Sequence, residues 1–231
     1  MFPANLEAIL FDAGGTLVHI DYAFVAEAAA GLGVAVSERA LLRGEAAARR
    51  AIDASASSLG FVGDTDASRV PGYFENLLRA AGLPEGTIAP VVRAMEAGHA
   101  ESNLWRVPLE GAIETLRGLR AQGVRAAVVS NGDGRIRAKL GSLGLAEHLE
   151  FVVDSFEEGV EKPHPEIFRR ALGRLGVAAE RAVYIGDIYS IDAVGARAAG
   201  LWPILIDPTG AYDAVDCPTI AGLRELLEGL G

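Results

Sequence analysis

The stretch LEAILFDAGGT, residues 6–16, decides the fold that this sequence predicts. Its first six residues form a largely apolar run, which predicts a buried strand. Asp12 follows the run directly, and Gly14 and Gly15 predict a tight turn after it. Open α/β sheets place their reactive groups at the carboxyl ends of the strands. We therefore expect Asp12 to serve as a nucleophile or as a metal ligand.

In the carboxyl-terminal half of the chain, predicted strands alternate with predicted helices. Continuously apolar runs at residues 124–129, 151–153, 182–185 and 203–206 predict parallel strands that are covered on both faces. Helical patterns lie between them at residues 110–122, 134–143, 165–175 and 190–199, and a last helix is expected at 220–230. The pattern predicts an α/β fold with a doubly wound, Rossmann-like parallel sheet.

The segment after the first strand breaks this rhythm, because it holds no convincing strand. Helical patterns cover residues 22–32, 37–58, 73–81 and 88–101, with Asp21 and Ser37 placed as N-caps. We therefore expect a core of residues 1–17 and 106–231, interrupted by an all-helical domain of residues 18–105. Within that insertion Tyr73 and Phe74 are expected to pack in its own core. Residues 60–66 are interpreted either as a substrate-facing loop or as a connector, and Arg43, Arg49 and Arg50 as a solvated helix face.

Composition narrows the class of protein. The 231 residues carry a net charge of −10, which argues against a nucleic-acid binder because phosphate backbones require a basic surface. The single cysteine, Cys217, allows no internal disulfide, and neither a leader pattern nor a membrane-spanning run is visible. We expect a soluble cytoplasmic protein that acts on a small molecule. Its oligomeric state is not legible from the sequence.

Two further strand ends carry groups that suit a phosphate. Ser130-Asn131-Gly132 follows the second strand and offers a hydroxyl and main-chain N–H groups. Lys162 stands before the helix at 165–175, and Lys139 is the only other lysine among 21 basic residues. A compact ammonium at Lys162 could neutralise both a phosphate oxygen and the Asp12 carboxylate. The neighbouring His164 is interpreted as a surface or capping residue.

A pair of carboxylates follows the strand at 182–185. Asp187 and Asp192 are five residues apart and straddle the strand end and the start of the next helix. Beside Asp12 they could converge on one cation, and hard oxygen ligands of this kind suit Mg²⁺. Asp187 could alternatively be only an N-cap.

Taken in order, Asp12, Ser130, Lys162 and the Asp187/Asp192 pair resemble the four motifs of the haloacid dehalogenase-like hydrolase superfamily. The resemblance implies that Asp12 attacks phosphorus and forms an aspartyl-phosphate, while Ser130 and Lys162 hold the phosphate. It also implies a helical cap over the active site and a Mg²⁺ cofactor. Its site residues map here to two sets: substrate binding by Gly15, Thr16, Asn131 and Gly132, and metal binding by Asp12, Gly14 (through its carbonyl), Asp187 and Asp192.

The first motif departs from the pattern of the phosphatases that the chain resembles. They use Asp-x-Asp-x-Thr, where the second aspartate is the general acid/base, and Gly14 occupies that position here. One interpretation is a slow Mg²⁺-dependent phosphohydrolase of a small phosphorylated metabolite, in which His19, Asp21 or a substrate group replaces the missing acid.

Two alternatives remain open. The 2-haloacid dehalogenases of the superfamily also lack the second aspartate and attack carbon through the first, but they usually lack the residue equivalent to Asp187. A non-catalytic binder of a phosphorylated ligand is the other alternative. Phosphonatase chemistry needs a lysine in the cap, and residues 18–105 contain none.

Overall fold

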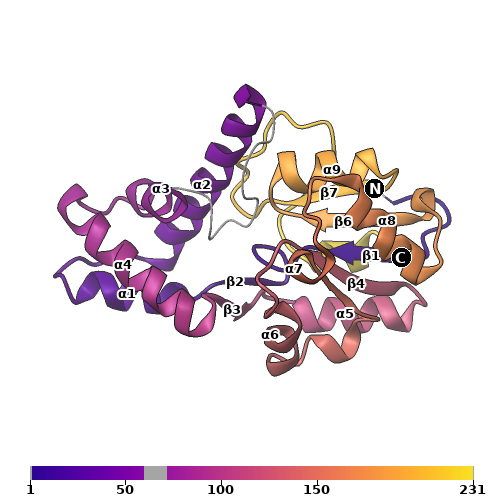
Figure 1. Cartoon of the computed structure of the whole chain (residues 1–231), viewed down its shortest axis with the longest axis horizontal. Helices are drawn as coiled ribbons and strands as arrows, with labels where there is room; N and C mark the ends of the chain where they lie inside the picture. The colour runs from indigo at the N-terminus through magenta and orange to yellow at the C-terminus, as the bar shows by residue number, and fades with distance from the viewer. Residues whose placement is uncertain (1, 60–71, 231) are drawn as a thin grey trace. The chain divides into compact units, whose positions relative to one another are not determined.

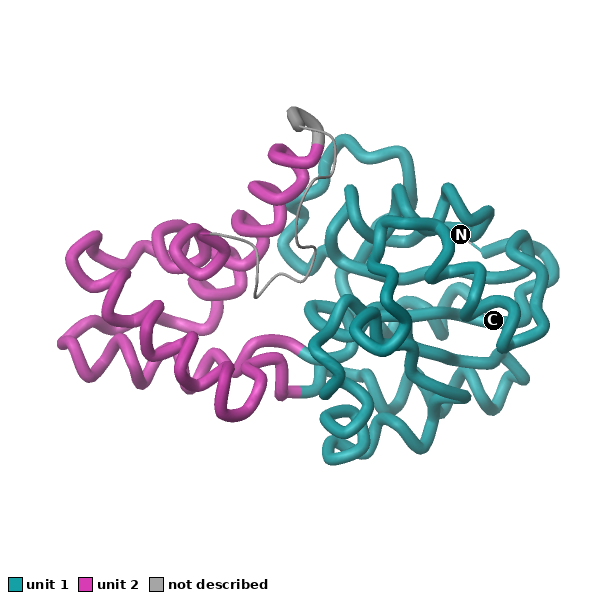
Figure 2. The backbone as a smooth tube through the Cα atoms, in the orientation of Figure 1, with its two compact units in different colours: residues 1–18, 108–231 teal, residues 19–107 magenta. Residues whose placement is uncertain are grey.

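The computed structural model describes residues 2–59 and 72–230, and it divides into two compact units (Figures 1 and 2). The core unit consists of residues 1–18 and 108–231, and the helical unit consists of residues 19–107. The expected loop at residues 60–66 lies outside the described residues. In the part of the chain that is described, no helix is long and apolar enough to cross a membrane.

The core unit is a six-stranded parallel sheet in the order β5-β4-β1-β6-β7-β8, with helices on both faces (Figure 1). Its Rossmann-like α/β architecture confirms the predicted fold class. The strands are β1 (Ala8–Phe11), β4 (Arg125–Ser130), β5 (Val152–Asp154), β6 (Ala182–Gly186), β7 (Trp202–Ile206) and β8 (Thr219–Ile220). The helices are α5 (Ala112–Ala121), α6 (Ile136–Ser142), α7 (Ser155–Glu158), α8 (Pro165–Leu175), α9 (Val194–Ala198) and α10 (Glu225–Glu228).

Alternating side chains of β1 supply the two halves of the core. Ala8 and Leu10 belong to a buried cluster with Ile167 and Phe168 of α8. Ile9 and Phe11, which point to the opposite face, are also fully buried. Burial on both faces explains why these strands are continuous apolar runs in the sequence.

The helical unit contains α1 (Tyr22–Ala30), α2 (Glu38–Leu59), α3 (Tyr73–Ala80) and α4 (Glu85–Ser102). Two predicted caps are confirmed: Asp21 Oδ1 accepts the Phe24 N–H at 3.0 Å, and Ser37 Oγ accepts the Ala40 N–H at 3.2 Å. The expectation that this segment holds no strand was wrong. β2 (Val18–Ile20) and β3 (Trp105–Pro108) pair as a two-stranded sheet, and both are too short to produce an alternating pattern.

A buried ionic group lies inside the helical unit. Glu45 of α2 is fully buried, pairs with Arg49 at 3.3 Å, and accepts hydrogen bonds from the hydroxyls of Tyr22 and Tyr73. Arg43 and Arg50 are exposed as expected, but Arg49 is only 4% exposed, so its assignment to a solvated face was wrong. A buried carboxylate needs such a partner. Tyr73 and Phe74 are buried in this unit's core, as predicted.

Two helices at the end of the core differ from the expectation. The predicted helix at 220–230 is confined to α10, because Thr219 and Ile220 pair with β7 as a sixth strand. The predicted helix at 190–199 opens with a π-helical turn, Tyr189–Ala193, before α9 begins. His164 caps α8 through Nδ1, which accepts the Glu166 N–H at 3.2 Å, in agreement with its predicted role.

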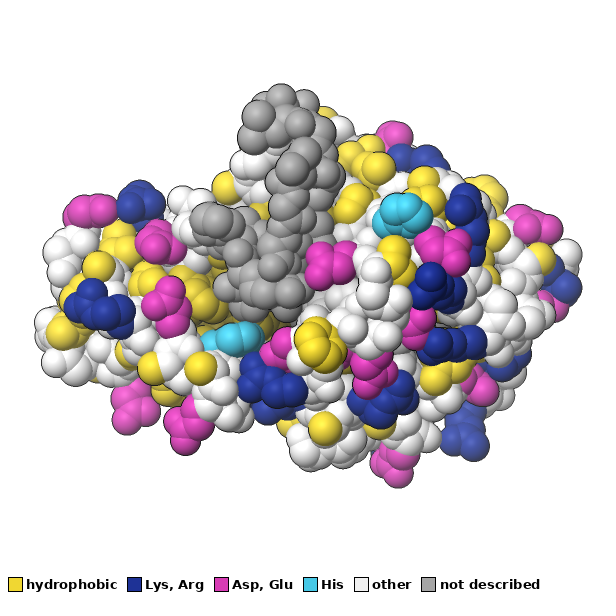
Figure 3. Space-filling view, in the orientation of Figure 1, with side chains coloured by type: hydrophobic (Ala, Val, Ile, Leu, Met, Phe, Trp, Pro, Cys, Tyr) yellow, Lys and Arg dark blue, Asp and Glu magenta, His cyan; other side chains and the backbone are white. Residues whose placement is uncertain are grey.

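Charged side chains of both signs are mixed over the core unit on the face that Figure 3 draws. Ion pairs between neighbouring helices account for part of this mixture. Arg174 of α8, for example, pairs with Glu158 at the end of α7 at 2.5 Å.

Candidate active site

Three neighbouring strands bring the candidate residues to one edge of the core sheet. Asp12 follows β1, Ser130 ends β4, and Asp187 follows β6. β1 lies between β4 and β6 and pairs in parallel with both. The carboxyl ends of the three strands therefore meet at one place, where open α/β sheets bind ligands.

The turn after β1 is closed by main-chain hydrogen bonds. The Gly15 N–H donates to the Val18 carbonyl at 2.7 Å, and the Leu17 N–H donates to the Ala13 carbonyl at 2.9 Å. Gly15 has a φ of +71°, and a Cβ placed there would lie 2.0 Å from Oδ2 of Asp187. Only glycine permits this close approach of the β1 turn to Asp187.

Thr16, in the same turn, is fully buried. Its Oγ1 has no hydrogen-bond partner among the residues that the structure describes. A buried hydroxyl without a partner is costly, so this atom is available to a ligand group.

Lys162 is the electrostatic centre of the site. Its Nζ forms an ion pair with Asp12 Oδ1 at 2.8 Å, and it donates to Asp192 Oδ1 at 2.8 Å and to the Tyr184 hydroxyl at 2.9 Å. Burial alone would lower the pKa of Lys162, but the two carboxylates outweigh burial and raise it. Lys162 is therefore a permanent cation, and the structure places it against Asp12 as the sequence led us to expect.

The loop after β4 fixes that lysine. The Asn131 amide brackets the Lys162 main chain: its Nδ2 donates to the Lys162 carbonyl at 2.9 Å, and its Oδ1 accepts the Lys162 N–H at 2.8 Å. The Gly132 N–H donates to Ser155 Oγ at 3.1 Å, and Ser130 is buried at the strand end. Contact of Asn131 and Gly132 with substrate stays a prediction, and their observed partners are protein groups.

Two residues of the site were missed by sequence reasoning. Asp154, at the end of β5, accepts the Gly134 N–H at 2.9 Å and the Phe156 N–H at 3.0 Å, and so holds the Asn131–Gly134 loop. The sequence feature that could have identified Asp154 is its position directly after the apolar run at 151–153. The Tyr184 hydroxyl donates to the Val129 carbonyl at 2.8 Å and accepts from Lys162. Nothing in the sequence distinguishes this tyrosine from an ordinary apolar strand residue.

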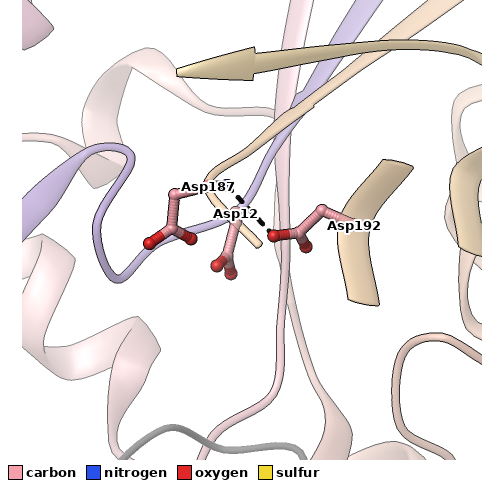
Figure 4. Close-up of side chains that lie close together, drawn as sticks. All are labelled: Asp12, Asp187 and Asp192. Atoms are coloured by element: carbon pink, nitrogen blue, oxygen red, sulfur yellow. Dashed lines mark hydrogen bonds between the residues drawn. The ribbon is translucent and has the colours of Figure 1, made fainter. Parts of the chain in front are cut away.

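Carboxylate oxygens of Asp12, Asp187 and Asp192 lie within 4.8 Å of one another, and all three residues are buried (Figure 4). This donor set fits Mg²⁺, which prefers oxygen ligands. Asp192 already accepts from Lys162 through Oδ1 and from the Asp187 and Ile188 N–H groups through Oδ2. Asp192 therefore orients both Lys162 and Asp187, and direct metal binding by Asp12, Asp187 and Asp192 stays a prediction.

The environment of Asp12 is set by opposing effects. Burial raises the pKa of Asp12 to about 6, Lys162 opposes that rise, and the nearby Asp192 adds to it. At neutral pH the carboxylate is still ionised, which is the form that a nucleophile or a metal ligand requires.

Of the two side chains suggested as a replacement acid, Asp21 is poorly suited. Its Oδ1 caps α1, and its Oδ2 pairs with Arg106 Nε at 3.0 Å. Burial alone would raise the pKa of Asp21, but the Phe24 N–H and Arg106 outweigh burial and lower it. A general acid near neutral pH needs the opposite shift. The Nδ1 of His19 lies 2.7 Å from the Ile20 carbonyl oxygen. Nε2 is therefore the ring nitrogen through which His19 could transfer a proton.

Comparison with known proteins agrees with this geometry. Over 137 residues the chain is 41% identical to haloacid dehalogenase-like hydrolase domain-containing protein 3 of Mus musculus, a match that covers 59% of this chain and 54% of that protein. It is 39% identical over 141 residues to the glyceraldehyde 3-phosphate phosphatase of Methanopyrus kandleri, which covers 60% of each. The chain spans about half the length of the curated relatives it matches.

Among solved structures, a putative HAD-hydrolase of Bacillus subtilis bound to magnesium has the same fold. The TM-score is 0.64 at 21% sequence identity, and the match covers 98% of this chain and 99% of that one. The model of the haloacid dehalogenase-like hydrolase family matches residues 6–200, which include Asp12, Ser130, Lys162, Asp187 and Asp192. The chain therefore belongs to the haloacid dehalogenase-like hydrolases.

Proposed function

We propose that the protein is a Mg²⁺-dependent phosphohydrolase that uses Asp12 to attack a small phosphorylated metabolite. The observation that carries this proposal is the setting of Asp12. It is a buried carboxylate, 2.8 Å from the permanent cation Lys162 and beside two further aspartates. Hydrolases with phosphatase names among the relatives support the same class of reaction.

Each residue has a part in the proposed reaction. A carboxylate oxygen of Asp12 forms a bond to phosphorus as the bond from phosphorus to the leaving oxygen breaks, and the leaving oxygen takes up a proton from water. Water then cleaves the aspartyl-phosphate, which releases phosphate and restores the carboxylate. Ser130, the Thr16 hydroxyl and Lys162 stabilise the negative charge of the phosphoryl oxygens. Mg²⁺ held by Asp12, Asp187 and the Gly14 carbonyl would supply further neutralisation of that charge.

Gly14 limits the rate, because the chain has no carboxyl group where related phosphatases carry their general acid/base. Positioned proton transfer contributes typically ~10²–10⁴-fold to a rate. Substrates whose leaving group departs without a proton, such as aryl or acyl phosphates, should therefore be hydrolysed faster than alkyl phosphates.

Hydrolysis of p-nitrophenyl phosphate with and without Mg²⁺, beside an Asp12→Asn variant, tests the proposal. Asparagine keeps the shape of the side chain and removes the nucleophile. A Mg²⁺-dependent rate that disappears in the variant supports the phosphohydrolase, and equal rates in both proteins contradict it.

A negative result would separate the two alternatives. Halide release from 2-chloropropionate that also depends on Asp12 would indicate a dehalogenase. Absence of both reactions, with retained binding of inorganic phosphate, would indicate a binding protein.

A further inference from the structure

We propose that Tyr212 is a positioning residue for the metal ligand Asp187 and acts through the Asp187 main chain. The inference rests on the proposed function, in which Asp187 holds Mg²⁺. Tyr212 lies in the connection between β7 and β8, far along the chain from the four sequence motifs. Its hydroxyl nevertheless reaches the segment that carries Asp187.

The main chain around Asp187 is held from both sides. On one side, Oδ2 of Asp192 accepts the Asp187 N–H at 3.1 Å and the Ile188 N–H at 3.0 Å (Figure 4). On the other side, the Tyr212 hydroxyl donates to the Asp187 carbonyl at 3.2 Å and accepts the Tyr189 N–H at 3.4 Å. These contacts fix the peptide groups before and after Asp187, and so fix the direction of its side chain.

Such support is needed because regular structure does not hold this segment. The β6–β7 ladder ends at Gly186, paired with Leu205, and the π-helical turn begins at Tyr189. Asp187 lies between the two. A rotation of its main chain would move the carboxylate, which lies so close to Gly15 that a Cβ on that residue would come within 2.0 Å of Oδ2.

Tyr212 is itself rigidly held. Its N–H donates to Asp207 Oδ2 at 2.7 Å, and the hydroxyl of Thr209 donates to Asp207 Oδ1 at 3.0 Å. The ring packs with Ala193 of the π-helical turn and Leu205 of β7. Tyr212 is 8% exposed and Asp207 is 7% exposed. The hydroxyl therefore acts from a fixed support, which a positioning group requires.

The variant Tyr212→Phe tests the inference, because it removes the hydroxyl and keeps the packed ring. Tyr189→Phe is its matched control. The Tyr189 hydroxyl belongs to the same pair of segments, but it donates to the exposed Asp216 at 2.7 Å rather than to the Asp187 main chain. Direct Mn²⁺ binding to the whole protein, followed by the paramagnetic resonance signal of free Mn²⁺, measures the site without any assay of turnover.

We expect Tyr212→Phe to weaken Mn²⁺ binding about 3- to 10-fold, the range for one neutral hydrogen bond behind a ligand, and Tyr189→Phe to leave it unchanged. The metal concentration for half-maximal hydrolysis should rise by the same factor, while kcat at saturating metal stays near wild type. Melting of the metal-free proteins shows whether each variant folds.

Equal Mn²⁺ affinity in wild type and Tyr212→Phe overturns the inference, and so does equal weakening in both variants. In those cases binding by the wild type leaves the proposed function intact. A wild-type protein that binds no Mn²⁺ overturns the proposed metal site and this inference together.

Discussion

Gly14 is the residue on which the rate of the proposed reaction depends. Its φ is not positive, unlike that of Gly15, so this position does not need glycine for a left-handed backbone conformation. We expect Gly14→Asp to raise kcat for an alkyl phosphate by about 10²-fold or more, because it restores a positioned proton donor. Steady-state kinetics checks this, with Gly14→Asn as the control of equal size that cannot transfer a proton.

Equal rates in the Asp and Asn variants would show that proton transfer at this position is not what limits the chain. A gain for alkyl phosphates with little gain for p-nitrophenyl phosphate would point directly to protonation of the leaving group.

Gly15 tests the packing of the site rather than its chemistry. We expect Gly15→Ala to abolish metal binding, because the new Cβ would lie 2.0 Å from Oδ2 of Asp187 and must displace it. Gly144→Ala is the control: its φ is also +71°, and a Cβ there meets nothing within 4 Å. Both variants carry the same backbone strain, so only the clash distinguishes them. Isothermal titration with Mg²⁺ measures the difference, and equal affinities would contradict it.

At the scale of single residues, the sequence predicts the charged groups of the site but not the groups that support them. Asp12 and Asp187 are charged residues that follow apolar runs, and Lys162 is one of only two lysines in the chain, so all three are conspicuous. Tyr184 and Tyr212 are not conspicuous, because their roles depend on which hydroxyl meets which main-chain group. That pairing exists only after the sheet and its connections have formed.

Among the elements, α1 offers a test with a defined pH dependence. Asp21 caps this helix and pairs with Arg106, and its pKa is lowered in the folded protein. A lowered folded pKa means that the carboxylate stabilises the fold above its unfolded pKa of about 3.9 and loses this effect as the pH falls through the folded value. We expect Asp21→Ala to lower the free energy of unfolding of the helical unit by about 1–2 kcal/mol near neutral pH.

Asp21→Asn separates the two contributions, since asparagine can still cap but cannot pair with Arg106. Its deficit should be smaller than that of alanine, and it should shrink as the pH is lowered from about 5 to about 3. Urea unfolding followed by circular dichroism measures both variants. A deficit that stays constant over this range would rule out the ion pair as its source.

The elements that sequence periodicity predicted well are those with a single way to bury their apolar side chains. β1, β4 and α8 are examples, and α8 has the predicted bounds. The region after residue 218 can bury its apolar side chains in two ways. Ile220 and the following leucines suit one long helix, and they also suit a strand followed by a short helix. The exposed edge of β7 decides in favour of β8. The local periodicity of the sequence holds no information about that edge, because β7 belongs to a distant part of the chain.

For the molecule as a whole, the core unit carries the whole candidate metal site. Asp12, Asp187 and Asp192 all belong to that unit. Clustering three carboxylates around one lysine leaves excess negative charge in a buried place, in a chain whose net charge is already −10. A divalent cation would relieve both the local and the overall repulsion.

Mg²⁺ should therefore stabilise the native state, and the core unit should report the effect. At a Mg²⁺ concentration about 100 times its Kd, a ligand that binds only the folded state adds ~2.7 kcal/mol to the free energy of unfolding. We expect amide hydrogen exchange in β1 and β6 to slow accordingly, since Asp12 and Asp187 directly follow these strands. In the Asp187→Asn variant, whose amide keeps the size of the side chain and removes its charge, the added Mg²⁺ should have little effect. Exchange in β1 and β6 that slows equally in the wild type and in this variant would show that Mg²⁺ acts elsewhere on the acidic surface. Slowing confined to the wild type would connect the stability of the sheet to the same carboxylates that the proposed chemistry requires.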